Sequence, residues 1–215
     1  MDRMKKQFLT FMQDCSALLF GEFTLKSGRK SPYFINTGEY TTNRQIERLG
    51  EFYGVMIEES MDEHGVEFDV LFGPAYKGIP LAVMAASNLE CEVGVAFNRK
   101  EAKDHGDGKL ILGHVPKNGD RVAIIEDVTT AGTSVRETIE LFKSMNIDVK
   151  IVALYISIDR MEKGTGDLSA TQQITKEFGI PVYSIATAQD IIKYLEKSGN
   201  SAAVAMREYL AQYGV

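Results

Sequence analysis

Residues 122–134 have the sequence Val122-Ala-Ile-Ile-Glu-Asp-Val-Thr-Thr-Ala-Gly-Thr-Ser134. The stretch begins with four apolar residues, which is typical of a buried parallel strand that is covered on both faces. Two adjacent acids follow, and then a turn of small and hydroxyl-bearing residues. Apolar residues recur at helical spacing from 134 to 145, so the turn is predicted to join a strand to a helix. A ligand is expected where this strand ends.

The turn between the predicted strand and helix is suited to a phosphate. Backbone N–H groups at the beginning of a helix lie at the positive end of its dipole and can hold an anion without a lysine. Gly132 allows a close approach of the backbone, and hydroxyl donors are supplied by Thr129, Thr130, Thr133 and Ser134. Glu126 and Asp127 instead suit ribose hydroxyls, a magnesium-bearing ligand or developing positive charge. Phosphate, diol and cation together indicate a ribose 5-phosphate, although an acid before such a turn can also be a simple helix N-cap.

Composition and charge narrow the class of protein. The chain has 215 residues with 44% hydrophobic content, which suits one α/β domain with a sizeable core. Its net charge of −6 argues against nucleic-acid and anionic-membrane partners. Cys15 and Cys91 lack the spacing of a metal site or a disulfide framework, as expected in a reducing compartment. Without a secretory segment or a membrane-spanning apolar run, we expect a soluble, cytoplasmic protein.

Hydrophobic periodicity predicts strands alternating with helices along most of the chain. The predicted strands are 23–25, 32–36, 70–72, 93–97, 122–125, 150–157 and 182–185, and the predicted helices are 1–20, 43–61, 79–87, 134–145, 188–196 and 202–213. This order implies a mainly parallel sheet with helices on both faces. Ligands of such sheets bind at the carboxyl ends of the strands, and the polar loops that follow residues 72, 97, 125 and 157 are therefore the candidate site.

Two of these loops are basic. The first, Gly73-Pro-Ala-Tyr-Lys-Gly78, combines two glycines with Lys77 and is a second candidate anion site, although Gly-Pro turns are also common without a function. The second is Phe97-Asn-Arg-Lys-Glu-Ala-Lys-Asp-His-Gly-Asp-Gly-Lys109. Its four basic side chains, which occur together with His105, are Arg99, Lys100, Lys103 and Lys109. In isolation it would be a solvated charged hairpin, but a protein of net negative charge that binds an anionic substrate needs such local cations.

The motif at 122–134 resembles the phosphoribosyl-diphosphate signature of the type I phosphoribosyltransferases, in which an acidic pair precedes a Thr-Ala-Gly-Thr phosphate loop. Neither the P-loop pattern nor the dinucleotide-binding glycine pattern is present. The stretch Asn98-Arg-Lys-Glu-Ala-Lys-Asp-His-Gly106 resembles the catalytic loop of the orotate branch of that family. Two more segments match that branch, Leu25-Lys-Ser-Gly-Arg-Lys-Ser-Pro-Tyr-Phe-Ile-Asn36 and Ser157-Ile-Asp-Arg160. The matches occur in the family's order over most of residues 20–165.

The resemblance implies the type I phosphoribosyltransferase fold, an α/β fold with a mainly parallel twisted sheet flanked by helices. Residues 1–215 would form a single domain, with 1–40 contributing to an N-terminal hood and 98–113 forming a mobile catalytic loop. The implied reaction joins orotate to 5-phosphoribosyl 1-diphosphate, giving orotidine 5′-monophosphate and pyrophosphate in pyrimidine (UMP) synthesis. Mg²⁺ is implied as cofactor, held mainly by substrate and water rather than by protein ligands. A homodimer is implied, in which the mobile loop reaches the neighbouring subunit.

The resemblance also assigns residues to roles. The catalytic residues would be Lys103, Glu126 and Asp127, with Lys103 having the strongest effect on rate. Phosphoribosyl diphosphate would contact Lys26, Tyr76, Lys77, Arg99, Lys100, Lys103, His105, Glu126, Asp127, Val128, Thr129, Thr130, Ala131, Gly132, Thr133 and Ser134. Orotate would contact Phe34, Ile35, Thr130 and Arg160. A second aromatic residue often occupies the position of Ile35, so only apolar or backbone contact is implied there. The peptide bond between Ala75 and Tyr76 is hypothesised to be cis, as in some family members.

Other functions are compatible with parts of the sequence. The phosphate motif alone would also fit a purine, hypoxanthine or uracil phosphoribosyltransferase, but the 98–106 loop and the segment around Lys26 resemble only the orotate branch. A non-catalytic regulator that senses phosphoribosyl diphosphate could keep the phosphate motif and dispense with the basic loop. A structural α/β protein would need several independent motifs to agree by coincidence.

Overall fold

The computed structural model describes residues 2–25, 28–100, 110–129, 132–164 and 166–215. Its centre is a six-stranded sheet of order β5-β4-β3-β6-β7-β8. The strands are β3 (Val70–Phe72), β4 (Gly94–Asn98), β5 (Ile111–Gly113), β6 (Arg121–Ile125), β7 (Lys150–Asp159) and β8 (Val182–Thr187). All neighbours are parallel except β4 and β5, which are antiparallel. The mainly parallel α/β sheet expected from the sequence is therefore confirmed.

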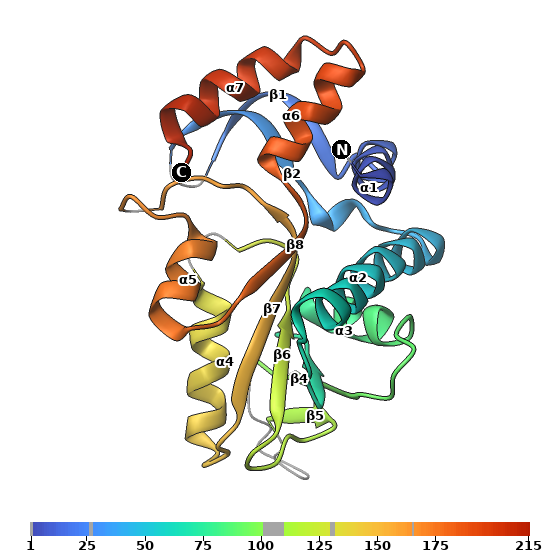
Figure 1. Cartoon of the computed structure of the whole chain (residues 1–215), viewed down its shortest axis with the longest axis vertical. Coiled ribbons are helices and arrows are strands. Elements are labelled where there is room, and N and C mark those ends of the chain that lie inside the picture. Colours follow the sequence, from blue (N-terminus) through green and yellow to red (C-terminus); the bar gives the residue numbers. More distant parts are fainter. Residues whose placement is uncertain (1, 26–27, 101–109, 130–131, 165) are drawn as a thin grey trace.

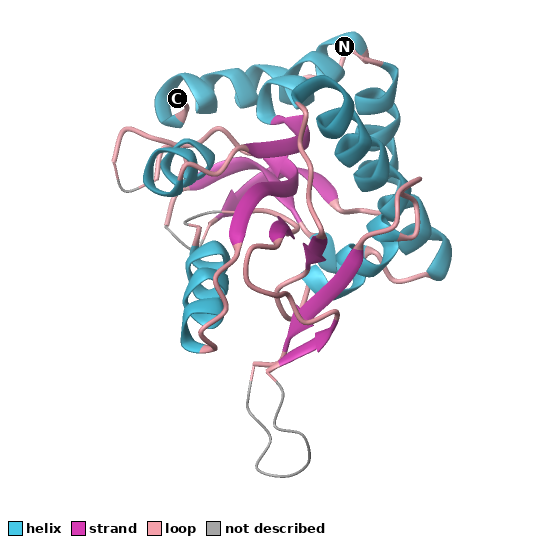
Figure 2. Ribbon diagram, turned by 60° about the horizontal axis from the view of Figure 1, so that its bottom comes forward, coloured by secondary structure: helices cyan, strands magenta, loops and turns pink. Residues whose placement is uncertain are grey.

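Helices cover both faces of this sheet (Figures 1 and 2). One face carries α2 (Asn43–His64) and α3 (Gly78–Ala86), and the other carries α4 (Thr133–Ser144) and α5 (Ala170–Phe178). The alternation of side chains along β6 explains the two layers. Ala123 and Ile125 pack in the cluster that includes α2 and α3, whereas Val122 and Ile124 pack toward α4 and α5. Because both sets are fully buried, the strand is apolar at every position from 122 to 125, as expected for a central parallel strand.

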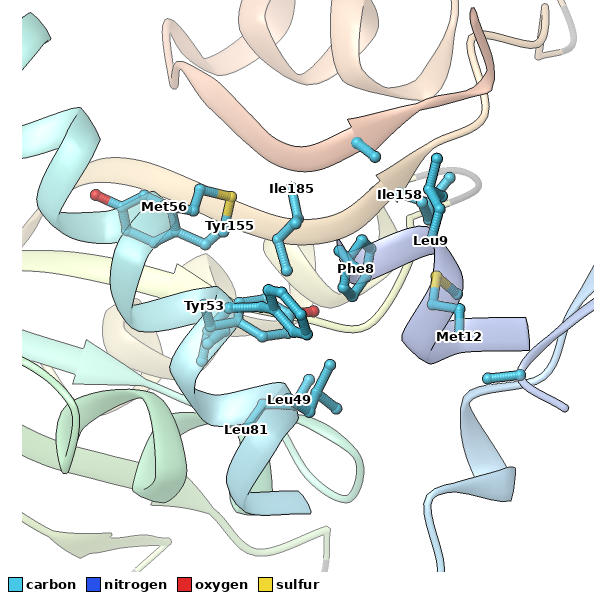
Figure 3. Close-up of a cluster of buried hydrophobic side chains, with 14 of the residues drawn as sticks. Phe8, Leu9, Met12, Leu49, Tyr53, Met56, Leu81, Tyr155, Ile158 and Ile185 are labelled. Atoms are coloured by element: carbon cyan, nitrogen blue, oxygen red, sulfur yellow. The ribbon is translucent and has the colours of Figure 1, made fainter. Parts of the chain in front are cut away.

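The hydrophobic cluster between the sheet and α2 also holds the N-terminal helix against the sheet. Phe8 in α1 (Arg3–Asp14) packs edge-on against Phe52 of α2, with ring centroids 5.1 Å apart. Figure 3 shows Phe8, Tyr53 and Ile185 meeting from three different elements. The first helix is thus fixed on the sheet by buried aromatic contacts, which agrees with an amphipathic helix that packs on the domain.

A second, two-stranded sheet lies beyond the carboxyl ends of the parallel strands (Figure 1). It consists of β1 (Leu18–Thr24) paired antiparallel with β2 (Lys30–Ile35), and we call these strands the hood hairpin. The short helix η1 (Thr37–Glu39) follows directly. Helices α6 (Ala188–Lys197) and α7 (Ala202–Tyr213) pack beside the hairpin, and Tyr209 meets Tyr33 at a ring-centroid distance of 6.2 Å. The C-terminal helices therefore pack against the N-terminal hood, to which the sequence analysis assigned residues 1–40.

The helix predicted over 1–20 was too long, because α1 ends at Asp14 and residues 18–20 belong to β1. Besides the short η1, strand β5 and helix α5 were not predicted from the sequence. Strand β5 has only three residues, too few for a periodic pattern, and it pairs through Leu112 with Phe97 at the sheet edge. Helix α5 buries only Thr171 and Ile174, so its apolar stripe is weak. Its beginning carries a capping box between Ser169 and Gln172, which is a signal that could have revealed it. No helix in the described part of the chain has the length and apolar character needed to cross a bilayer.

Candidate functional site

The acidic pair lies at the carboxyl end of β6, where buried groups hold its backbone. The Glu126 N–H donates to the carbonyl of Tyr155 at 2.9 Å, and its own carbonyl accepts from the Tyr53 hydroxyl at 2.7 Å. The Asp127 carbonyl accepts from the Ser157 hydroxyl at 2.6 Å and from the Ser157 N–H at 2.9 Å. These bonds satisfy the backbone at the strand end, so both carboxylates project from a fixed position.

A cavity of about 290 Å³ opens above the strand end. Its walls come from three loops and the first turn of α4, namely Pro74, Ala75, Asn98, Lys100, Glu126, Val128, Thr129, Gly132, Thr133, Ser134, Glu137 and Thr138. Seven of these are predicted phosphoribosyl-diphosphate contacts: Lys100, Glu126, Val128, Thr129, Gly132, Thr133 and Ser134. The predicted contacts Thr130 and Ala131 lie outside the described residues. The cavity therefore gathers most of the strand-turn-helix motif around one space.

Gly132 gives the turn its shape. It adopts a left-handed conformation with φ of 66° immediately before α4, and its N–H donates to the Thr129 hydroxyl at 3.2 Å. Residues with side chains rarely adopt this conformation, which explains the glycine. Helix α4 has no side-chain cap at its N-terminus. Its first N–H groups thus remain available to an anion in the cavity.

The Gly73–Gly78 loop forms the opposite wall. Its peptide bond between Ala75 and Tyr76 is cis, as the sequence hypothesis stated. The Ala75 N–H donates to Asn98 Oδ1 at 2.8 Å, which ties the loop to the end of β4. Sequence reasoning missed Asn98 as a site residue, although it directly precedes the basic stretch. Tyr76 is 71% exposed and points away from the core.

Lys77 does not stand free in this structure. Its Nζ donates to Asp127 Oδ2 at 2.7 Å and to the Thr37 hydroxyl at 3.0 Å, while the Thr37 hydroxyl donates to the same Oδ2 at 2.5 Å. The sequence predicted Lys77 and Asp127 as binding residues but not their ion pair, and it did not indicate Thr37. A smaller cavity of about 100 Å³ lies beside this cluster, lined by Thr37, Tyr40, Ile46, Leu49, Tyr53, Lys77, Pro80, Leu81, Asp127 and Ser157.

Glu126 has an unusual protonation equilibrium. Its pKa is raised from 4.5 to about 7. Burial is the main cause and the neighbouring Asp127 charge adds to it, whereas a hydrogen bond with Ser134 and the charge of Lys77 oppose the shift. The carboxyl therefore exchanges its proton near neutral pH. The two acids differ in their ion pairs: Asp127 has a direct cationic partner in Lys77, whereas Glu126 has none at hydrogen-bond distance among the described residues.

We expect Glu126→Gln to remove a pH dependence of folding stability. The raised pKa means that the folded state binds this proton more tightly than the unfolded state, so the stabilisation is complete below pH 4.5 and is lost as the pH rises through about 7. Glutamine is neutral throughout, and the variant should become more stable than the parent by on the order of 2 kcal/mol above that pH.

Urea unfolding at pH 5 and pH 8 measures this difference in the free energy of unfolding. Glu140→Gln, at an exposed carboxylate of α4, is the matched control. Equal pH dependence of parent and Glu126→Gln would contradict the assignment.

The predicted orotate contacts lie nearer to the hood hairpin. Phe34 on β2 stacks against Phe23 with ring centroids 5.5 Å apart, and Ile35 packs against the main core. Arg160 is mostly buried, with its Nη2 2.6 Å from Glu162 Oε1 and its guanidinium 4.2 Å from the centroid of the Tyr33 ring. Within the described ranges neither cavity is lined by these predicted contacts. Their contact with a base stays a prediction.

The basic loop is described only at its ends. Arg99 closes the strand pair through its N–H, which donates to the Leu110 carbonyl at 2.8 Å. Its Nη1 is buried and has no hydrogen-bond partner among the described residues. Lys100 is exposed and lines the larger cavity. The predicted site residues Lys26, Lys103 and His105 lie outside the described residues.

Comparisons with known proteins agree with this geometry. Residues 36–184 match the family model described as "Phosphoribosyl transferase domain". The chain is 45% identical over 227 residues to orotate phosphoribosyltransferase of Lachnoclostridium phytofermentans, covering 100% of this chain and 99% of that protein. It is 46% identical over 221 residues to the orotate phosphoribosyltransferase of Vibrio cholerae, with 100% of both chains covered. The crystal structure of orotate phosphoribosyltransferase from Francisella tularensis superposes with a TM-score of 0.82 at 35% identity, covering 97% of this chain and 100% of that one.

Proposed function

Because this chain belongs to the phosphoribosyltransferase family and, within it, to the orotate phosphoribosyltransferases, we propose that the cavity at the end of β6 holds phosphoribosyl diphosphate. The enzyme transfers the phosphoribosyl group of this donor to orotate, giving orotidine 5′-monophosphate and pyrophosphate in pyrimidine biosynthesis. One observation carries the assignment of the site: the phosphate turn, the acidic pair and the Lys77 loop surround one strand end.

The 5-phosphate binds at the uncapped beginning of α4. Thr133 and Ser134 line the cavity and offer hydroxyls, and the N–H groups of the first turn point in the same direction. Thr129 faces the same space. A phosphate in this position gains several hydrogen bonds and the favourable helix dipole without a cationic side chain.

The two acids act on the ribose. Glu126 and Asp127 accept hydrogen bonds from the ribose hydroxyls and stabilise the positive charge of an oxocarbenium-like transition state. Asp127 is only 8% exposed, so its charge acts in a medium where water screens little. The pairing of Asp127 with Lys77 supports an ionised carboxylate at this position.

The departing pyrophosphate is bound by cations from two loops. Lys77 and Lys100 border the two cavities, and the buried Nη1 of Arg99 lacks a partner among the described residues, which supports an anionic ligand there. Lys103 and His105 complete this set in the proposal. In the proposal Lys77 turns from Asp127 toward the anion, because a multiply charged pyrophosphate attracts the ammonium more strongly than a single carboxylate does.

Orotate binds beside the ribose, between the hood hairpin and the end of β7. Phe34 supplies an aromatic surface, Ile35 an apolar or backbone contact, and Arg160 a cation for the orotate carboxylate. Lys26 and Thr130 complete the proposed contacts. The pair between Arg160 and Glu162 supports a fixed orientation of the guanidinium.

Mg²⁺ fits this site as a cofactor carried by the substrate. It prefers oxygen ligands and keeps several waters, and the carboxylates of Glu126 and Asp127, which line the two cavities, could supply protein oxygens. No group of three or more potential metal-binding side chains occurs within the described ranges. When bound, the ion would neutralise charge on the pyrophosphate. The two unpaired cysteines, Cys15 and Cys91, support a cytoplasmic location.

An absorbance assay tests the proposed function. Purified chain is mixed with orotate, phosphoribosyl diphosphate and Mg²⁺, and the loss of orotate absorbance is followed. Adenine, hypoxanthine and uracil serve as alternative acceptors under the same conditions. We expect turnover with orotate and none with the three alternative acceptors. Turnover with a purine and none with orotate would overturn the assignment.

The proposed homodimer uses the exposed apolar surface beside the site. Tyr76 of the Gly73–Gly78 loop is 71% exposed, and Val83 of α3, the helix that follows this loop, is 45% exposed. Large apolar side chains that are exposed in and after this loop support an interface there. In such a dimer the 98–113 loop of one subunit would close over the site of the other.

Mixing two inactive variants tests loop sharing. We expect Lys103→Ala to lower turnover strongly, because loss of one preorganised contact raises the barrier by about 3 kcal/mol. In a heterodimer with an Asp127→Asn chain, one site receives both intact residues, so an equal mixture should recover roughly a quarter of the parent activity. Turnover is measured after the chains are mixed, denatured and refolded. Heterodimers that form but remain inactive would contradict a shared loop.

A further inference from the structure

Thr37 lies outside the motifs that identify the site, yet it touches the catalytic acid. It is the first residue of η1, directly after the hood hairpin. Its hydroxyl donates to Asp127 Oδ2 at 2.5 Å and accepts from Lys77 Nζ at 3.0 Å, while Lys77 donates to the same Oδ2 at 2.7 Å. The Thr37 hydroxyl, Lys77 Nζ and Asp127 Oδ2 come from three separate segments, and each is hydrogen-bonded to the other two.

The turn that carries Thr37 is held in place by its own hydrogen bonds. Asn36 Oδ1 accepts from the Gly38 N–H at 3.3 Å, and Asn36 Nδ2 donates to Glu39 Oε1 at 2.7 Å. The Asn36 N–H donates to the Ala17 carbonyl at 2.8 Å, which anchors the turn to the start of the hood hairpin. The position of the Thr37 hydroxyl is therefore set by the backbone rather than by a long side chain.

The two donors to Asp127 Oδ2 differ in what else attracts them. Lys77 is charged, its side chain is 63% exposed, and it lies in the loop proposed for pyrophosphate. A bound pyrophosphate competes with Asp127 for this ammonium. Thr37 is neutral and faces no such competitor, because an anion gains far more from the lysine.

Departure of Lys77 would leave a buried carboxylate in need of its other partner. Asp127 is 8% exposed, and its Oδ1 accepts from the Val128 N–H at 2.8 Å. Among the described residues, Thr37 is then the one remaining side-chain donor to Oδ2. Burial of an oxygen that has lost its hydrogen bonds is unfavourable, and the carboxylate would rotate away from its working position.

We propose that Thr37 is a positioning residue that holds the Asp127 carboxylate toward the ribose while Lys77 moves to the pyrophosphate. The same hydrogen bond connects the hood hairpin to the end of β6. The inference rests on the proposed role of Asp127 and deepens it.

Thr37→Val tests the inference, because valine keeps the shape of threonine and removes the hydroxyl. We expect kcat to fall about tenfold, the effect of losing one hydrogen bond to a charged group. The KM for orotate should stay near that of the parent chain. Thr37→Ser keeps the donor and should restore most of kcat. A Thr37→Val chain that turns over as fast as the parent, or faster, would overturn the inference.

A double-mutant cycle separates positioning from a general disturbance. In an Asp127→Ala chain the acceptor is gone, so adding Thr37→Val should lower kcat little further. If Thr37→Val lowered kcat by the same factor in the parent chain and in the Asp127→Ala chain, the inference would be overturned. Thr41→Val is the matched control, since Thr41 is exposed and its hydroxyl has no hydrogen bond within the described part of the chain. Failure of the parent chain to consume orotate would instead count against the proposed function, which keeps the two failures apart.

Discussion

Asp127→Asn is expected to lower kcat by roughly a hundredfold or more while the fold stays intact. The side chain is almost fully buried, and its charge has no substitute at the point where positive charge develops on the ribose. Asparagine retains the size. Its Oδ1 can still accept from the Val128 N–H, and its Nδ2 can donate to the Thr37 hydroxyl, so the packing around the strand end is preserved. The loss should therefore appear in catalysis rather than in stability.

The substrate dependence gives this prediction a second readout. Without the carboxylate, Lys77 loses its ion pair and becomes available to pyrophosphate, so the KM for phosphoribosyl diphosphate should not rise. Steady-state kinetics with each substrate varied separates the two parameters. Asp148→Asn, at an exposed position before β7, is the matched control. Turnover of Asp127→Asn close to that of the parent chain would remove this residue from the mechanism.

Gly73→Ala should abolish most activity and also destabilise the fold. A Cβ on Gly73 would lie 2.1 Å from the Gly78 carbonyl oxygen and 2.5 Å from the Gly78 carbonyl carbon. Both are backbone atoms of the same loop, and a flexible side chain cannot move aside to relieve the overlap. We expect a loss of about 2–3 kcal/mol in the free energy of unfolding. The displaced loop would also carry Lys77 away from the site.

Urea unfolding and kcat, measured on the same preparations, test this expectation. Gly166→Ala is the control, because a Cβ there meets no atom within 4 Å. If Gly73→Ala retained both the stability and the turnover of the parent chain, the loop would not need the close backbone approach that we infer.

The fold was predictable where neighbouring residues carry the signal. The β6-turn-α4 unit follows from an apolar run, a glycine that tolerates positive φ and helical periodicity, and the structure confirms it. Weak local signals explain the two omissions. The three residues of β5 show no period, and α5 buries too few side chains to form a visible stripe.

The site was predictable as a set of residues and not as a set of contacts. Most described residues of the motif at 126–134 line one cavity, and the 73–78 loop, which was expected beside this motif, contributes Pro74 and Ala75 to the same cavity. Asn98, which anchors that loop to β4, was missed because a single amide side chain carries no spacing pattern. Lys77 was expected to stand free for an anion, whereas the structure shows it paired with Asp127.

By itself, the sequence determined the strand-turn-helix unit, the succession of strands and helices along most of the chain, and the family, because each is carried by short stretches of consecutive residues. The tertiary structure alone decided that Thr37, Lys77 and Asp127 meet. Lys77 and Asp127 are 50 positions apart, and Thr37 and Asp127 are 90 apart. No local pattern encodes such a contact, since it arises only when parallel strands place their carboxyl ends at one edge and the hood hairpin packs across it. The carboxylate proposed to act on the ribose is thus specified locally, while its orientation is a property of the whole fold.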